Sequence, residues 1–169
     1  MLDHLLEEVD AFSSRLKDGS GAFEYEVLAP SEPFKHWRHN WREVLFHADS
    51  ALAPEVIDRF GVYLLATPDL EIFYIGKASR SSAAEIREAR PNYYLGAEIW
   101  KKIGAAGDGL LARKANLSAE LRRAIEEFDI SIVAIDIRPH QLAACVETYL
   151  QAICVLQDGK LPEANAQIG

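Results

Sequence analysis

Residues 60–66, FGVYLLA, and residues 71–76, EIFYIG, are two short apolar runs separated by the turn-like residues Thr-Pro-Asp-Leu. Such runs, rich in β-branched and aromatic residues, are typical of the two strands of a β-hairpin. Residues 130–137 are rich in Ile and Val and predict a third strand. Glycine inside a strand usually marks a close backbone approach or a bend, which singles out Gly61 and Gly76.

Amphipathic segments surround these strands. Leucine, valine and phenylalanine recur at three- and four-residue steps over residues 2–16, which predicts a helix that ends at the Asp-Gly-Ser-Gly of residues 18–21. Residues 23–28 alternate weakly and suit a short edge strand. Further helices are expected at residues 34–48, 81–89 and 93–103, after the N-cap residue Ser118, and from residue 140 to about 157.

The resulting fold class is α+β, with a small three-stranded antiparallel sheet flanked by helices and an N-terminal helical extension. We expect residues 1–57 to form an accessory helical segment and residues 58–169 to form the functional domain. With 169 residues, 49% hydrophobic and 26% charged, the chain can bury the core of one globular domain. Disordered and disulfide-scaffold classes are therefore excluded.

Apolar runs, the N-terminal residues and the two cysteines indicate the cellular location. No apolar run approaches the roughly 20 residues of a membrane span. The N-terminus is acidic and lacks the basic region of a signal peptide, so we expect a soluble cytoplasmic protein with no membrane partner. Cys145 and Cys154 lie nine residues apart on one predicted helix, too far apart to bridge, and are interpreted as buried free thiols.

Charge is unevenly distributed along the chain. The formal net charge is −8, which by itself argues weakly against binding to phosphates. Residues 1–60 carry six Lys/Arg against twelve Asp/Glu, whereas residues 74–123 carry ten against five. The middle of the chain is thus a basic tract, which is either an ordinary solvated surface or a binding face.

The hairpin and the last predicted helix carry the residues with chemical potential. Tyr63 and Tyr74 lie on adjacent strands, each beside a glycine, and Lys77 follows directly. At 100° per residue, Glu147 falls roughly 120° from the centre of the apolar stripe of the last helix, beside Ala143, from where it can reach a cleft next to the core. On burial statistics alone, the tyrosines are core aromatics and the glutamate is solvated.

Taken together, Gly61-Val62-Tyr63, Tyr74-Ile75-Gly76-Lys77, Glu147 and the tail Pro162-Glu163-Ala164-Asn165 resemble the signature of the GIY-YIG nucleases. That family includes the 3′-incision module of bacterial nucleotide-excision repair, some homing endonucleases and some restriction enzymes. The resemblance covers about residues 58–169. It implies a metal-dependent endonuclease, a hydrolase that cleaves phosphodiester bonds in DNA.

The resemblance also implies a role for each residue. Glu147 is the implied ligand of Mg²⁺ or Mn²⁺, and one carboxylate with several waters suits Mg²⁺. Tyr63 is the implied general base or water-positioning group, assisted by Tyr74 and Lys77. Asn165 is expected to hydrogen-bond within the site and to fix the tail across it. The tyrosine hydroxyls and Glu147 are expected to converge on one cleft, and a Glu147 on the opposite side of the sheet from Tyr63 and Tyr74 would overturn this active-site assignment.

An arginine that clamps the phosphate is the main departure from the family pattern, because Ala84 stands at the usual position. Arg87 is our first candidate and Arg80 the second. Arg80 is otherwise expected to contact the DNA backbone, together with the remaining cations of the tract, which are Arg90, Lys101, Lys102, Arg113 and Lys114.

Two further functions stay open. The first is a nucleic-acid-binding or regulatory module that keeps the fold and cleaves little or not at all. The second is a protein–protein adaptor, since the aromatic helix at residues 34–48 needs a cover from the core, a second copy or a partner protein. His36 and His39 on that helix have metal-ligand spacing without supporting ligands, and Asp136 at the end of the third strand is expected to be structural.

Overall fold

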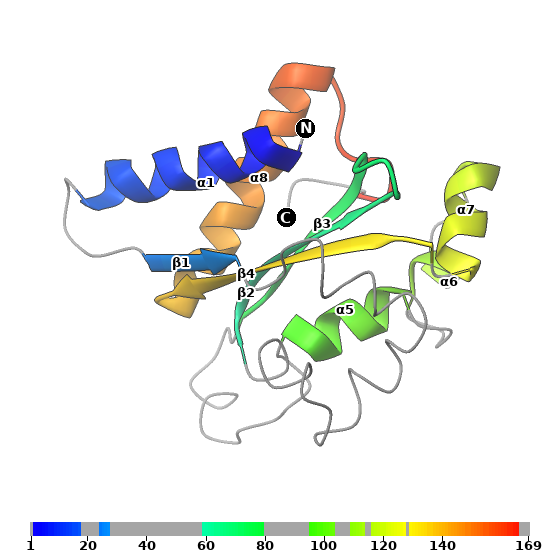
Figure 1. The fold of residues 1–169 in the computed structure, drawn as a ribbon, viewed down its shortest axis with the longest axis horizontal. Helices are drawn as coiled ribbons and strands as arrows, with labels where there is room; N and C mark the ends of the chain where they lie inside the picture. Colours follow the sequence, from blue (N-terminus) through cyan, green and yellow to red (C-terminus); the bar gives the residue numbers. More distant parts are fainter. Residues whose placement is uncertain are drawn as a thin grey trace.

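The computed structural model describes residues 2–17, 24–27, 59–79, 95–103, 109–113, 116–127 and 129–165. The helices predicted at residues 34–48 and 81–89 lie outside this part of the chain, as do His36 and His39. The described residues form an α+β fold in which helices cover a central antiparallel sheet (Figure 1).

The sheet has four strands in the order β1-β4-β2-β3. The predicted hairpin is present as β2 (Gly61–Ala66) and β3 (Ile72–Ala78), and the predicted third strand as β4 (Ser131–Arg138). The expected count of three strands is wrong, because β1 (Glu24–Val27) also joins the sheet by pairing antiparallel with β4. β3 is therefore one edge of the sheet and β1 the other.

The two faces of the sheet are covered by different helices (Figure 1). The first face, which carries Tyr63 and Leu65 of β2, packs against α5 (Leu95–Ile103), α6 (Leu110–Arg113) and α7 (Ala119–Glu126). The second face, which carries Val62 and Leu64, packs against α8 (Ala143–Asp158) and α1 (Leu2–Lys17). Every residue of β2 is buried because both of its faces are covered.

Local capping fixes the helices that border the sheet. The Ser118 hydroxyl accepts a hydrogen bond of 3.3 Å from the backbone N–H of Leu121, which confirms the predicted N-cap of α7. A short 3₁₀ turn (His140–Leu142) precedes α8, and α8 ends at Gly159. Gly159 has φ +70°, the left-handed conformation that glycine adopts without a side-chain penalty.

The described part of the N-terminal segment is built into the same core. Leu5 and Val9 of α1 are completely buried in the cluster that α8 forms with the second face. Phe12 stacks on Tyr149 of α8, with ring centroids 4.9 Å apart, and the Tyr149 hydroxyl donates a hydrogen bond to Glu8. α1 therefore braces α8, the helix that carries Glu147.

The two cysteines differ in exposure. Cys154 is buried, but Cys145 is exposed, so the interpretation of both thiols as buried is wrong for Cys145. Across the described residues, none of the helices combines the length and apolar character that crossing a bilayer requires.

Candidate functional site

Gly76 makes room for the two tyrosines. It pairs with Tyr63 across the hairpin. A Cβ on Gly76 would lie 2.6 Å from the Cζ and the hydroxyl oxygen of Tyr63, and 2.6 Å from Cε1 of Tyr74. Because carbon atoms do not approach so closely, the two rings can lie over this part of β3 only if residue 76 is glycine.

Gly61 is required for a different reason. A Cβ there would lie 1.8 Å from the backbone carbonyl oxygen of Ile135 in β4. That neighbour is backbone and cannot rotate away. The two glycines thus explain the close approach that their positions in the strands predict, one beneath a pair of rings and the other against the adjacent strand.

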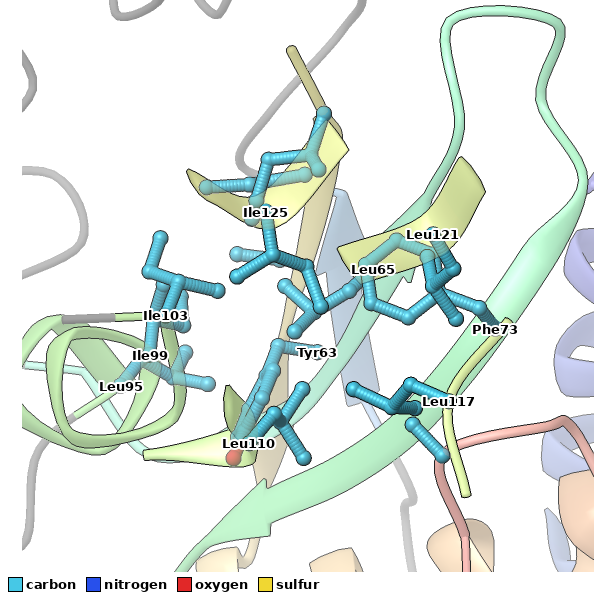
Figure 2. Packing of buried hydrophobic residues seen from close by; sticks show 14 of the residues in the cluster. Tyr63, Leu65, Phe73, Leu95, Ile99, Ile103, Leu110, Leu117, Leu121 and Ile125 are labelled. Atoms are coloured by element: carbon cyan, nitrogen blue, oxygen red, sulfur yellow. The ribbon is translucent and has the colours of Figure 1, made fainter. Parts of the chain in front are cut away.

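Tyr63 is completely buried, and Figure 2 shows its ring among aliphatic side chains of the first face. Its hydroxyl has no hydrogen-bond partner of normal geometry among the described residues. Burial raises the pKa of Tyr63 well above 10.0, and smaller contributions come from the charge of Tyr74, from Glu98, from a side-chain contact with Tyr74 that lacks normal hydrogen-bond geometry, and from Glu147. The phenol is therefore neutral at physiological pH and can donate or accept a hydrogen bond.

Tyr74 lies beside Tyr63, with ring centroids 5.9 Å apart and planes tilted by 34°. The ammonium of Lys102, in the last turn of α5, lies over the Tyr74 ring, 5.3 Å from its centroid. Lys102 was expected only as a DNA contact, and the structure places it against one of the predicted catalytic tyrosines. No local pattern could have indicated this contact because the two residues belong to different elements.

Lys77 and Glu147 form an ion pair on the second face. Nζ of Lys77 is 2.9 Å from Oε2 of Glu147. The glutamate side chain is only 9% exposed, whereas the lysine side chain is 34% exposed. Oε2 accepts no hydrogen bond of normal geometry within the described residues, so the contact is electrostatic. A nearly buried carboxylate thus faces a cation that solvent can reach.

The expected single cleft is wrong, which overturns the active-site assignment in that form. Tyr63, Tyr74 and Gly76 share the first face of the sheet, whereas Lys77 pairs with Val62 and shares the second face with α8. Side chains alternate between the faces of a strand, so Lys77 and Glu147 approach β3 from the opposite side to the tyrosine rings. What the two pairs share is the edge strand itself, at Gly76 and Lys77.

The two halves of the site are nevertheless close. The Tyr63 hydroxyl lies at the backbone of Gly76, and the charge of Glu147 is near enough to contribute to the raised pKa of Tyr63. Only one layer of strand, without a side chain at residue 76, separates the phenol from the ion pair.

Asn165 binds the tail to the edge of β3. Its Oδ1 accepts a hydrogen bond of 2.9 Å from the backbone N–H of Ile75, and its Nδ2 donates one of 2.8 Å to the carbonyl of Ile75. The N–H of Ala164 donates a further bond of 2.8 Å to the carbonyl of Phe73. The Asn165 amide thus bonds to the backbone of Ile75 as a neighbouring strand would, and it holds the tail against β3.

Two polar side chains near the site, Gln151 and Glu98, were not predicted from the sequence. Gln151, buried on α8, donates a hydrogen bond of 3.3 Å to the same carbonyl of Ile75. Glu98 of α5 raises the pKa of Tyr63 and pairs with Lys101 at 2.7 Å. Gln151 falls four residues after Glu147 on a helix whose neighbouring positions are apolar, and that spacing is the signal that could have revealed it.

The remaining predicted residues divide into two groups. Asp136 is buried and pairs with Arg138 at 2.6 Å and with Arg59 at 3.5 Å, which gives it a structural partner on each side. Arg113 is described in its backbone alone. Four predicted cations of the basic tract lie outside the described residues, and they are Arg80, Arg87, Arg90 and Lys114.

A cleft of about 610 Å³ lies at a different place in the described structure, between the β2–β3 turn, α7 and the tail. None of Tyr63, Tyr74, Lys77 and Glu147 lines it. Among the described residues, no group of three or more His, Cys, Asp or Glu side chains gathers as a metal cage.

No protein-family model, curated protein or solved structure matches the chain.

Proposed function

We propose that this chain is a GIY-YIG-type endonuclease that hydrolyses phosphodiester bonds in DNA with the help of a divalent cation. The observation that carries the proposal is the arrangement around Gly76 and Lys77 on the edge strand. A buried phenol without a hydrogen-bond partner of normal geometry lies on one side, and a carboxylate–ammonium pair lies on the other. Buried polar atoms normally have partners, and an unpaired one needs an explanation, of which a catalytic role or a bound ion is one.

Tyr63 acts as a neutral phenol in this proposal. Its raised pKa disfavours the tyrosinate, so it orients the attacking water or a phosphate oxygen by hydrogen bonding and does not hold a negative charge before substrate arrives. Tyr74 packs beside it, and Lys102 adds positive charge over the Tyr74 ring. Lys77 is exposed enough to meet the phosphate and stabilise the charge that develops there.

The donor set at Glu147 fits Mg²⁺ or Mn²⁺. Oε2 of Glu147 is buried and accepts no hydrogen bond of normal geometry from the described residues, and a single carboxylate completed by water is a common way of holding Mg²⁺. When bound, the cation supplies Lewis-acid stabilisation of the phosphate. Lys77 provides the positive charge beside Glu147 in the ion pair.

Asn165 acts through position in this proposal. Both polar atoms of its amide are bonded to the backbone of Ile75, so it holds the edge strand and the tail in register next to the site. Asn165 is therefore a positioning residue of the proposed site.

The phosphate clamp is proposed to come from Arg87, with Arg80 as the alternative. Loss of a transition-state clamp lowers turnover by roughly 10²–10³-fold, whereas loss of a backbone contact weakens binding and reduces its salt dependence. Arg87→Ala is therefore expected to bind DNA and fail in turnover, and Arg80→Ala to bind more weakly and still cut at saturation. The reverse result assigns the clamp to Arg80.

Cleavage of supercoiled plasmid in Mg²⁺ or Mn²⁺ tests the proposal. Glu147→Gln keeps the shape of the side chain and removes its charge, so nicking should fall at least about a hundredfold, on the scale of losing one preorganised electrostatic group. Glu126→Gln, at an exposed position of α7, is the matched control and should retain full activity. Equal nicking by wild type and Glu147→Gln would contradict the proposal.

The second candidate is a nucleic-acid-binding module without cleavage. It is favoured over cleavage by the placement of the tyrosines and Glu147 on opposite faces of the sheet. Fluorescence anisotropy with a labelled duplex separates the two functions. Salt-sensitive binding with no nicking in either cation would favour the binding module.

A further inference from the structure

We infer that Gln151 is a positioning residue. It fixes the position of α8 along the edge strand β3 and thereby places Glu147 beside Lys77. This inference rests on the proposed function of Glu147. Gln151 is 1% exposed and donates from Nε2 to the carbonyl of Ile75 over 3.3 Å.

The helix and the strand carry matched contacts. Glu147 reaches Lys77, and Gln151, one helical turn later, reaches Ile75, two residues earlier on β3. Four residues of α-helix rise about 6 Å, and two residues of strand span about 6.6 Å. The two contacts therefore fit together at one position of α8 along β3, and a shift of the helix by one residue breaks both.

The acceptor of this hydrogen bond is itself fixed. The carbonyl of Ile75 also accepts a bond of 2.8 Å from Nδ2 of Asn165, whose Oδ1 accepts from the N–H of the same residue. Gln151 thus joins α8 to a point that the tail already holds. The helix, the edge strand and the tail meet at Ile75, two residues from Lys77.

The contact has a consequence that distinguishes positioning from stability. In Gln151→Met the side chain keeps its approximate length and loses its donor, while Ile75 keeps its bond from Asn165. The carbonyl of Ile75 is therefore not left unpaired, and the variant should still fold. What it loses is the bond that fixes α8 one turn from Glu147.

A thermodynamic cycle tests the inference without any activity. Gln151→Met and Lys77→Met are made singly and together, and their urea unfolding is measured. If Gln151 holds Glu147 against Lys77, the combined change in the unfolding constant should differ from the product of the single changes by about threefold or more, as for coupled residues. Additive changes would overturn the inference. Gln157→Met, at an exposed position of α8, is the matched control and should be additive.

Kinetics provide a second readout in a wild type that cleaves. Gln151→Met should lower kcat by about tenfold or more, the scale of a small misplacement of a reacting group. It should also need more Mg²⁺ for half-maximal rate and leave the KM for DNA nearly unchanged. Unchanged kcat and Mg²⁺ dependence would overturn the inference. A wild type that does not cleave would contradict the proposed function, and the unfolding cycle would still decide the role of Gln151.

Discussion

The hydroxyl of Tyr63 lies over the backbone of Gly76, at a point only 2.6 Å from where the first side-chain carbon of any other residue would stand. One residue without a side chain therefore permits a phenol to approach the backbone of the edge strand, buried and without a hydrogen-bond partner of normal geometry in the described structure. A buried hydroxyl without a partner costs stability.

Gly76→Ala should disturb both tyrosines. The new methyl group overlaps Tyr63 and Tyr74, and relieving that overlap should cost about 1–3 kcal/mol of unfolding free energy, as for other overpacked cores. Urea unfolding measures the loss, and the near-ultraviolet circular dichroism of the tyrosines should change with it. Gly159→Ala is the control, because only its φ of +70° is strained and no atom lies within 4 Å. An unchanged tyrosine signal in Gly76→Ala would contradict this account.

Tyr63→Phe and Tyr149→Phe should change stability in opposite directions. Removing the hydroxyl of Tyr63, which has no partner of normal geometry, should raise the unfolding free energy by about 1 kcal/mol, because no bond is lost and a buried polar atom disappears. The hydroxyl of Tyr149 donates to Glu8, so its removal should lower the unfolding free energy by about 1 kcal/mol. Thermal unfolding of the two variants gives the comparison, and a loss of stability in both would show that Tyr63 has a partner.

Alkaline pH should destabilise the wild type through Tyr63. Burial, followed by the neighbouring Tyr74, raises its folded-state pKa well above 10.0, so the unfolded chain loses this proton first as pH rises. The contribution to stability is complete below about pH 10 and is lost above it, with a slope of at most about 1.4 kcal/mol per pH unit. The difference in unfolding free energy between wild type and Tyr63→Phe, measured from pH 8 to pH 11, removes the effect of the other tyrosines. A difference independent of pH would contradict the raised pKa.

The strands of the core were predictable because their signals are local. Short apolar runs marked β2, β3 and β4, and both glycines pointed to close contacts that the structure contains. β1 was expected only as a short edge strand, and the sheet was counted as three-stranded. Its membership depends on pairing such as that of Tyr25 with Ile137, a contact between distant parts of the chain that local propensity does not report.

The sequence did not predict which face of the sheet each helix covers. The helical spacing correctly placed Glu147 beside Ala143, which is buried on α8. All six residues of β2 are buried, however, so the strand lacks the alternation of polar and apolar residues that would mark its faces. The sequence could not show which face α8 covers, and the expected single cleft failed for that reason.

Removing Lys77 from its ion pair with Glu147 should cost more stability than removing the charge of Glu147. Lys77→Met leaves a carboxylate that is 9% exposed without its cation, whereas Glu147→Gln leaves an ammonium that is 34% exposed and can be solvated. The lysine variant should therefore lose more stability, about 1–3 kcal/mol against less than about 1 kcal/mol. Urea unfolding of both variants measures the two losses, and equal losses would contradict the difference in exposure.

The same pair predicts how the protein responds to a divalent cation. In the wild type, the ammonium of Lys77 lies 2.9 Å from the oxygen that a cation would use, so Mg²⁺ has to compete with it. In Lys77→Met the carboxylate is free of this competitor, and Mg²⁺ should stabilise the variant more than the wild type. A cation at about five times its dissociation constant adds about 1 kcal/mol, which corresponds to roughly 2–4 °C in Tm for a chain of this size. Thermal unfolding with and without Mg²⁺ gives the shift, and the double variant Lys77→Met with Glu147→Gln should show none. A Mg²⁺ shift that persists in the double variant would mean that the cation binds elsewhere, and equal shifts in wild type and Lys77→Met would mean that Lys77 does not shield the carboxylate.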